Sequence, residues 1–260
     1  MLTSRLCTQA QVESDEFRFW CERIQEPPNR HRKLWEFYFI AQALFERGML
    51  APGRRGLGFG VGREPLTALF ASYGCTIVAT DLDTGSASRW RRSGEHAGGL
   101  DELNDRGICP QDRFRELVSF RTVDMNRIPA DLRGFDFVWS SCAFEHIGSI
   151  GRGKRFVRRA MDCLRPGGVA VHTTEYNVRN RWITAPIGKT VLFRKRDIVS
   201  IATQLTRDGH RVELDLDPGS GPLDAYIDRP PYRSEPHLKL RIGPFTATSV
   251  GLIVEKGVKA

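Results

Sequence analysis

Three alternating glycines lie between a basic pair and an apolar run in the stretch RRGLGFGVGREPLTALFASYG, residues 54–74. Because glycine has no Cβ, Gly58, Gly60 and Gly62 allow the backbone to turn sharply or to approach a ligand closely. The spacing does not fit the dinucleotide pattern GxGxxG, and the sequence contains no phosphate loop of the form GxxxxGK[ST]. The remaining pattern, GxGxG between a predicted strand and a predicted helix, indicates a polar ligand held by backbone N–H groups and a helix N-terminus.

Two aspartates follow the next predicted strands. Asp81 ends the strand after the glycines, where a carboxylate can accept hydrogen bonds from ribose hydroxyls. Asp124 ends the following strand, in VDMNRIP, and is placed to meet the amine of an adenine. These two positions, together with the glycines, predict a ligand that contains a nucleoside.

Further polar residues follow the later strands and could act on an acceptor. His146, in WSSCAFEH, is a candidate general base, since histidine most often removes a proton from an alcohol nucleophile. The adjacent Glu145 is a second candidate catalytic residue. The alternative for His146 is that it only supports the loop. Glu145, Glu175 and His237 are also candidate ligands of a divalent cation, and oxygen-rich ligation would suit Mg²⁺. Their spacing forms no compact metal motif, so the alternative interpretation is a strand end that places polar side chains in water.

Strands and helices alternate over most of the chain, which predicts an α/β fold with a doubly wound, mainly parallel sheet and a ligand at the carboxyl ends of its strands. Residues 1–50 are expected to form an N-terminal helical cap, and residues 51–260 the ligand-binding domain. The last two predicted strands are joined by the Pro-rich loop 218–244 without a clear helix, which predicts an antiparallel hairpin at one edge. Strands are predicted at 75–83, 117–125, 135–142, 169–177, 211–217 and 245–256, helices at 13–50, 64–74, 151–168 and 194–210, and partly helical structure at 84–115.

The glycine turn, the two aspartates, the polar end of the fourth strand and the helix that stops at LRPGG occur on consecutive β/α units. In this order they resemble the class I S-adenosylmethionine-dependent methyltransferases, over roughly residues 53–176 and more weakly through the terminal hairpin. The resemblance implies a Rossmann-like sheet of seven strands with an antiparallel last strand. It also implies S-adenosylmethionine as the cofactor.

By the same resemblance, the three glycines would lie against the methionine part of the cofactor. Asp81 and the adjacent Leu82 would hold the ribose, Asp124 and Met125 would face the adenine, and Ser140 would lie under the sulfonium. The family usually has an acidic residue two positions before the first glycine. In this sequence that position is Gly56. The amino group of the cofactor therefore needs another partner, and Glu64 or a residue of the N-terminal cap is expected to supply it.

The acceptor is expected to be a small molecule or an oligosaccharide. The segments 190–198 and 228–240 look like those of bacterial methyltransferases associated with glycan or polysaccharide biosynthesis, which implies O-methylation of a sugar or another hydroxylated metabolite. A rigid proline loop that merely covers the sheet edge is the alternative for the second segment. The candidate contacts with the acceptor are His172, Glu175, Tyr232, Arg233 and His237.

Composition limits the other classes of function. The formal charge of +8 admits a nucleic acid, but the basic residues are dispersed, the Pro-Pro-Tyr segment lies outside the fourth strand and no Pro-Cys dipeptide occurs. Methylation of nucleic acid and a non-catalytic S-adenosylmethionine-binding module therefore remain as alternatives. The absence of a signal peptide, of an apolar run long enough to span a membrane and of a CxxC motif predicts a cytoplasmic protein with reduced thiols. The sequence leaves open whether the protein forms a homo-oligomer.

Overall fold

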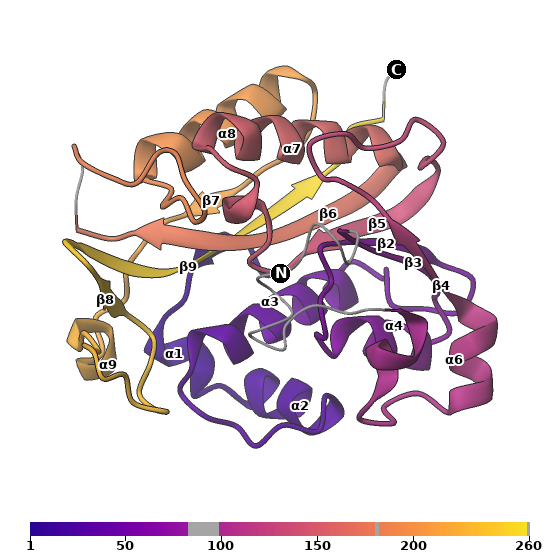
Figure 1. Cartoon of the computed structure of the whole chain (residues 1–260), viewed down its shortest axis with the longest axis horizontal. Coiled ribbons are helices and arrows are strands. Elements are labelled where there is room, and N and C mark those ends of the chain that lie inside the picture. Colours follow the sequence, from indigo (N-terminus) through magenta and orange to yellow (C-terminus); the bar gives the residue numbers. More distant parts are fainter. Residues whose placement is uncertain (83–98, 180–181, 259–260) are drawn as a thin grey trace.

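A sheet between two layers of helices dominates the computed structural model, which describes residues 1–82, 99–179 and 182–258 (Figure 1). Within these residues the sheet has nine strands in the order β4-β3-β2-β5-β6-β9-β1-β7, with β8 paired to β9. The strands are β1 Ser4–Leu6, β2 Arg55–Phe59, β3 Thr76–Asp81, β4 Val118–Thr122, β5 Phe135–Ser140, β6 Leu164–Asn177, β7 Leu214–Asp215, β8 Leu240–Ile242 and β9 Phe245–Glu255. The doubly wound α/β fold is therefore confirmed.

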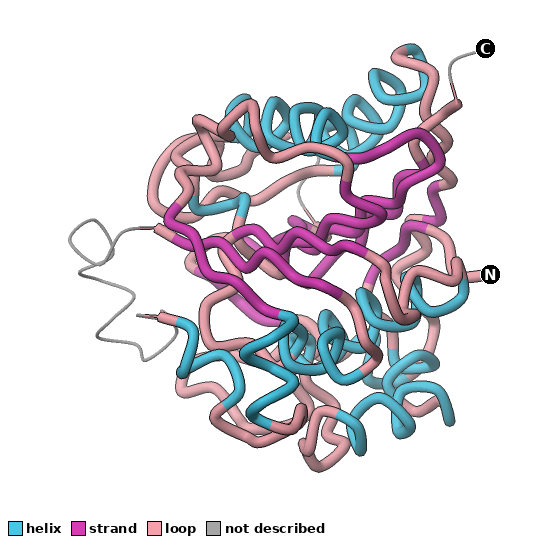
Figure 2. The backbone as a smooth tube through the Cα atoms, turned by 90° about the vertical axis from the view of Figure 1, so that its right-hand side faces the viewer, coloured by secondary structure: helices cyan, strands magenta, loops and turns pink. Residues whose placement is uncertain are grey.

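Helices cover both faces of the sheet, as the end-on view in Figure 2 shows. Helix α3 packs against β6 and β9 and α4 against β3, while α7 packs on β5 and β6 with α8 beside it. The helices are α1 Gln9–Val12, α2 Asp15–Arg23, α3 Arg32–Glu46, α4 Leu66–Ser72, α6 Gln111–Leu117, α7 Ile150–Cys163, α8 Lys195–Arg207 and α9 Pro222–Ala225, with 3-10 turns at Leu100–Asn104 and Phe144–His146. No helix in the described ranges has both the length and the apolar character needed to cross a bilayer.

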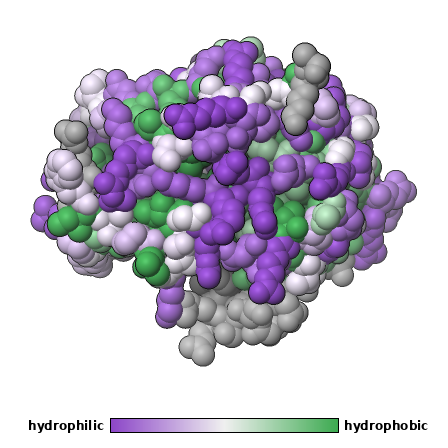
Figure 3. Space-filling model, turned by 90° about the horizontal axis from the view of Figure 1, so that it is seen from above, coloured by the Kyte–Doolittle hydropathy of each residue, from purple (hydrophilic) through white to green (hydrophobic). Residues whose placement is uncertain are grey.

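The two helical layers enclose separate apolar cores because the central strands alternate their side chains between faces. Trp139 of β5 packs with Phe70 of α4, at 5.0 Å between ring centroids. Val138 points to the opposite face, into a cluster with Phe156 and Val157 of α7. The outer side of α7 and α8 is hydrophilic, as expected for amphipathic helices (Figure 3).

The terminal part of the sheet differs from the prediction of seven strands and a terminal hairpin. Strand β7 does not pair with β9 along its length, because β1 lies between them, parallel to β7 and antiparallel to β9. The hairpin partner of β9 is instead β8, which lies within the loop predicted at 218–244. The predicted strand at 211–217 shortens to two residues.

The N-terminal segment contributes both a strand and a helix to this arrangement. Helix α3 approaches the sheet closely over Gly251 of β9, where any Cβ would overlap the ring of Phe39. The segment 1–50 thus includes β1 as a member of the sheet besides the expected helices.

Two local predictions also change. The Pro-Gly-Gly at 166–168 does not close a helix, since α7 ends at Cys163 and β6 begins at once, with a shift of register opposite β5. Of the partly helical stretch predicted at 84–115, residues 84–98 lie outside the described residues, and the remainder contains the turn at Leu100–Asn104 and the start of α6. All six cysteines are buried thiols.

Candidate active site

The glycine turn links β2 to α4 and lies against the loop after β5. Gly60 and Gly62 both have left-handed backbone angles, with φ of +60° and +51°. A Cβ on Gly60 would stand 2.9 Å from Cβ of Ala143 and 3.4 Å from Sδ of Met125, so the turn leaves a surface of bare backbone. Gly58 has a different role: it lies within β2, in space that the indole of Trp139 requires.

The two predicted aspartates lie at the carboxyl ends of neighbouring strands, β3 and β4. Asp81 accepts hydrogen bonds from the backbone N–H of Gly62 at 3.0 Å and of Leu82 at 2.7 Å, which fixes its carboxylate beside the glycine turn. Asp124 is exposed and accepts a hydrogen bond from the backbone N–H of Asn126 at 2.8 Å. The structure therefore brings both carboxylates to the edge of the sheet that the glycine turn occupies.

A buried carboxyl group lies near the glycine turn, although Gly56 itself has none. Glu64 accepts a hydrogen bond from Nε1 of Trp139 at 2.6 Å and is almost fully buried. The pKa of its carboxyl is raised from 4.5 to about 8, mainly by burial and also by the charges of Asp81 and Glu36, against the lowering effects of the Trp139 hydrogen bond and Lys33. Gly56 lies in the middle of β2, where the ring of Phe137 fills the space that a side chain would need.

These features fit the cofactor that the sequence resemblance implies. The bare backbone at Gly60 allows a ligand to approach closely, and the carboxylate of Asp81 is held where hydroxyl groups can reach it. Glu64 is a carboxyl group whose burial would be compensated by a cation.

Ser140 and His172, by contrast, have their side chains in the core beneath α7. The hydroxyl of Ser140 lies 2.8 Å from Nδ1 of His172, and neither residue is exposed to solvent. The rings of Phe144 and Phe156 meet His172 edge-on, and burial lowers its pKa to about 3. The side chains of His172 and Ser140 therefore lie in the core rather than at the surface.

His146 lies on the 3-10 turn that follows β5, with about a fifth of its side chain exposed. Its Nδ1 lies 2.9 Å from the carbonyl oxygen of Lys189 and 3.2 Å from the hydroxyl of Thr190. A carbonyl can only accept a hydrogen bond, so this contact places a proton on Nδ1, and in the neutral imidazole the lone pair is then on Nε2. Nε2 is 3.8 Å from Oε1 of Glu145, which is fully buried.

Helix α3 adds a group of charged residues that the sequence analysis did not single out. Arg32 pairs with Glu175 of β6 and, at 3.3 Å, with Glu36 one turn along α3. Glu36 also accepts hydrogen bonds from the hydroxyls of Ser249 and Thr173. The i, i+4 spacing of arginine and glutamate on a mainly apolar helix was the signal that could have revealed this group.

The predicted metal triad of Glu145, Glu175 and His237 is not assembled. Nδ1 of His237 lies 2.6 Å from a carboxylate oxygen of Asp228, and its ring stacks on His31 at 4.6 Å between centroids. The structure instead groups Glu145 and Glu175 with Cys142, with the three ligand atoms within 4.8 Å of one another.

Tyr232 and Arg233 lie on the same loop as His237. The phenol of Tyr232 donates to the carbonyl of Arg241 at 2.6 Å, and its ring is partly exposed. The backbone of this loop is joined to the start of α3, since the N–H of Arg32 donates to the carbonyl of His237 at 3.1 Å. The loop therefore borders the charged residues of α3.

Comparison with known proteins agrees with this geometry. Residues 57–172 match the family model of a methyltransferase domain. Among solved structures, the [4+2]-cyclase SpnF is similar at a TM-score of 0.54 and 16% identity, over 85% of this chain and 81% of that chain. A protein from Bacillus halodurans C-125 assigned as a methyltransferase is similar at a TM-score of 0.52 and 14% identity, over 84% of this chain and 99% of that chain.

A protein from Galdieria sulphuraria assigned as a sarcosine dimethylglycine methyltransferase is similar at a TM-score of 0.50 and 15% identity, over 94% of this chain and 99% of that chain. Comparison with curated protein sequences gave no match. At these identities the solved structures support the fold, while the domain match covers the glycine turn, both aspartates and His146. The domain match over residues 57–172 and the fold of the chain together support a class I S-adenosylmethionine-dependent methyltransferase.

Proposed function

We propose that this protein transfers a methyl group to a hydroxyl of a sugar, a glycan or another small hydroxylated molecule, with His146 as the general base. The observation that carries the proposal is the contact between Nδ1 of His146 and the carbonyl of Lys189. This contact leaves the lone pair on Nε2, as removal of a proton from an alcohol requires. Methyl transfer would then form a bond between the acceptor oxygen and the methyl carbon, break the bond from that carbon to sulfur and move the hydroxyl proton to Nε2.

S-adenosylmethionine supplies the methyl group as a sulfonium when it is bound. Gly60 and Gly62 would lie against its methionine part, Asp81 would accept hydrogen bonds from the ribose, and Asp124 with Met125 would border the adenine. Glu64 would take the place of the missing motif acid, because its buried carboxylate gains a counter-ion from the cofactor's amino group. The protein's contribution is mainly alignment and the exclusion of water.

The acceptor would meet residues from three parts of the chain at the carboxyl edge of the sheet. His146 comes from the turn after β5, and the charged residues of α3 lie beside the end of β6. The exposed ring of Tyr232 and the nearby Arg233 suit a carbohydrate, since an aromatic face covers C–H groups and guanidinium groups donate to hydroxyls.

The proposal is tested by labelled methyl transfer from S-adenosylmethionine to fractionated glycans and small hydroxylated metabolites. We expect His146→Ala to lower the turnover number by about 10²-fold or more while leaving the cofactor affinity, measured by calorimetry, nearly unchanged. His210→Ala, in a histidine remote from the glycine turn, is the matched control.

Equal losses of cofactor affinity and turnover in His146→Ala would show that His146 is structural. Labelling of nucleic acid in place of hydroxylated small molecules would overturn the acceptor class. Saturable cofactor binding without transfer to any tested fraction would favour a non-catalytic module.

A further inference from the structure

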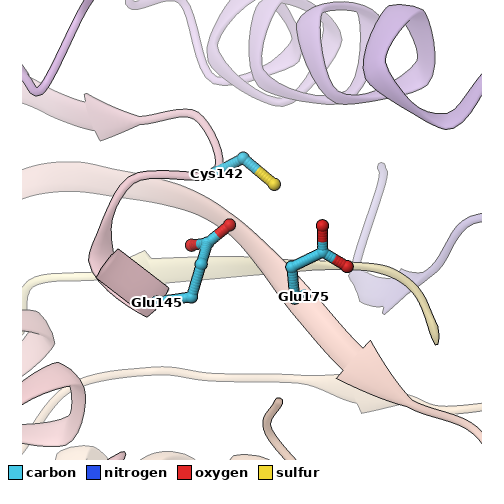
Figure 4. A group of neighbouring side chains, drawn as sticks. All are labelled: Cys142, Glu145 and Glu175. Atoms are coloured by element: carbon cyan, nitrogen blue, oxygen red, sulfur yellow. The ribbon is translucent and has the colours of Figure 1, made fainter. Parts of the chain in front are cut away.

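We propose that Cys142, Glu145 and Glu175 form a binding site for a divalent transition-metal ion such as Zn²⁺. Cys142 and Glu145 come from the loop and turn after β5, and Glu175 comes from β6. Figure 4 shows the sulfur and both carboxylates turned toward the same space, and one ligand atom of each lies within 4.8 Å of the others. The inference goes beyond methyl transfer, and metal binding can be measured without it.

Two buried carboxylate oxygens at this point lack hydrogen-bond partners. Oε1 of Glu145 and Oε2 of Glu175 are inaccessible to solvent, and neither receives a hydrogen bond from any described residue. Oε1 of Glu145 is 3.8 Å from Nε2 of His146, too far for a hydrogen bond. An unpaired buried carboxylate oxygen is costly, so this pair of oxygens calls for a cation.

The other oxygen of each carboxylate is held in place by a donor. Oε2 of Glu145 accepts a hydrogen bond from the hydroxyl of Thr174 at 2.9 Å, and Oε1 of Glu175 is paired with Arg32. Each group is thus oriented with one oxygen fixed and one directed into the shared space. In established metal sites, groups that do not bind the metal hold the ligating side chains in the same way.

The backbone of Cys142 holds the thiol beside the two glutamates in an uncommon conformation. Its φ of +46° is in the left-handed region, which is uncommon and strained for residues other than glycine. The strain is held by its backbone N–H, which lies 3.1 Å from both the carbonyl and the hydroxyl oxygen of Thr173. The thiol of Cys142 lies 3.3 Å from Oε1 of Glu36, to which it donates while it is protonated.

The surrounding charges are consistent with a dication. With Cys142 as a thiolate, the group and the adjacent Glu36 would carry four negative charges, and Arg32 and Lys33 supply two positive ones. A divalent ion brings the sum to zero. The hydroxyl donors on Glu36 would remain when the thiol loses its proton.

The donor set determines the type of metal. A thiolate with two carboxylates suits Zn²⁺ or Co²⁺ and disfavours Mg²⁺, which takes oxygen ligands. Three protein ligands leave a fourth position free for water or a substrate oxygen. Bonds of about 2.0 Å to oxygen and 2.3 Å to sulfur require the ligand atoms to approach slightly closer than they do here.

The test is titration of the metal-free full-length protein with Co²⁺, followed by absorption spectroscopy. We expect one equivalent to produce a thiolate-to-cobalt charge-transfer band in the near ultraviolet, to be displaced by Zn²⁺ and to persist in excess Mg²⁺. Cys142→Ser should abolish the band, and Glu145→Gln and Glu175→Gln should weaken Zn²⁺ binding by at least about 10-fold. Cys163→Ser, which alters a buried thiol of α7, is the matched control and should retain the band.

Thr174→Val keeps all three ligands and should weaken Zn²⁺ binding by about 10- to 100-fold, so the proposal remains testable if Cys142→Ser does not fold. Binding of Co²⁺ without the band, a band that persists in folded Cys142→Ser, or equal Zn²⁺ affinity in the wild type and both glutamine variants would overturn the site. None of these results affects methyl transfer by His146, because cofactor binding and turnover are measured separately.

Discussion

Replacing Glu64 with glutamine should make the folded protein more stable at neutral pH and weaken its binding of S-adenosylmethionine. The carboxyl of Glu64 is buried against Trp139, and burial raises its pKa from 4.5 to about 8. Between these two pKa values, the folded state therefore holds a proton on Glu64 that the unfolded state has lost. A glutamine of the same shape still accepts the hydrogen bond from the indole but does not ionise.

The size of the effect follows from the pKa difference. Between pH 4.5 and pH 8 the folded state binds more protons than the unfolded state, so the free energy of unfolding falls as the pH rises. The slope is about 1.4 kcal/mol per pH unit, which amounts to roughly 3 kcal/mol between pH 4.5 and pH 7. Glu64→Gln should lack this component, so its stability relative to the wild type should grow with pH over this window.

Denaturant unfolding of both proteins at several pH values between 4 and 8 measures the component directly. The exposed Glu16→Gln is the matched control for removal of a surface carboxyl. Parallel stability curves for the wild type and Glu64→Gln would refute the assignment of a raised pKa to this residue.

Cofactor binding provides the second half of the test. If the amino group of S-adenosylmethionine lies beside Glu64, binding at pH 7 should release about 0.9 proton from the wild type, since nearly all of the carboxyl is protonated before binding. Calorimetry in buffers of different ionisation enthalpy measures this number, and the glutamine variant should release none. Equal affinity and equal proton release in the two proteins would exclude Glu64 as the replacement for the motif acid.

Three further variants test the cofactor site, the packing of α3 on the sheet and the loss of stability at acid pH. Asp81→Asn should weaken cofactor binding by about 10- to 100-fold in calorimetry without loss of fold, because its single amide oxygen can still accept one of the two backbone hydrogen bonds that Asp81 accepts with separate oxygens. Gly251→Ala should destabilise the protein by about 1–3 kcal/mol in denaturant unfolding, since its Cβ overlaps Phe39, and an added Phe39→Leu should restore part of the loss. Burial lowers the pKa of His31 from 6.5 to about 4, so its neutral form stabilises the fold above pH 6.5 and this stability is lost as the pH falls toward 4. His31→Asn can still accept the hydrogen bond from the N–H of Lys33 at the start of α3. Between pH 6.5 and pH 4, its free energy of unfolding should fall by about 1–2 kcal/mol less than that of the wild type. An equal fall in the two proteins would contradict this expectation.

Much of the fold could be predicted from local patterns. Apolar runs identify the central strands because these strands are buried on both faces, and the positions of Gly60 and Asp81 follow from where one strand ends and the next element begins. Strand β1 escaped prediction because three residues are too few to show a period. Its place between β9 and β7 depends on pairing across most of the length of the chain.

The candidate site could also be predicted only in part. The sequence by itself placed Glu145, His146 and Glu175 at the ends of strands, since residues that end parallel strands meet at one edge of a sheet. The packing of the folded chain determines which of these side chains point into a common space, which lie in the core, and that Cys142 rather than His237 joins the two glutamates. The physical reason is that strand ends are set by local hydrophobic patterns, whereas the direction of each side chain is set by loop conformation, register and the packing of α3 against the sheet.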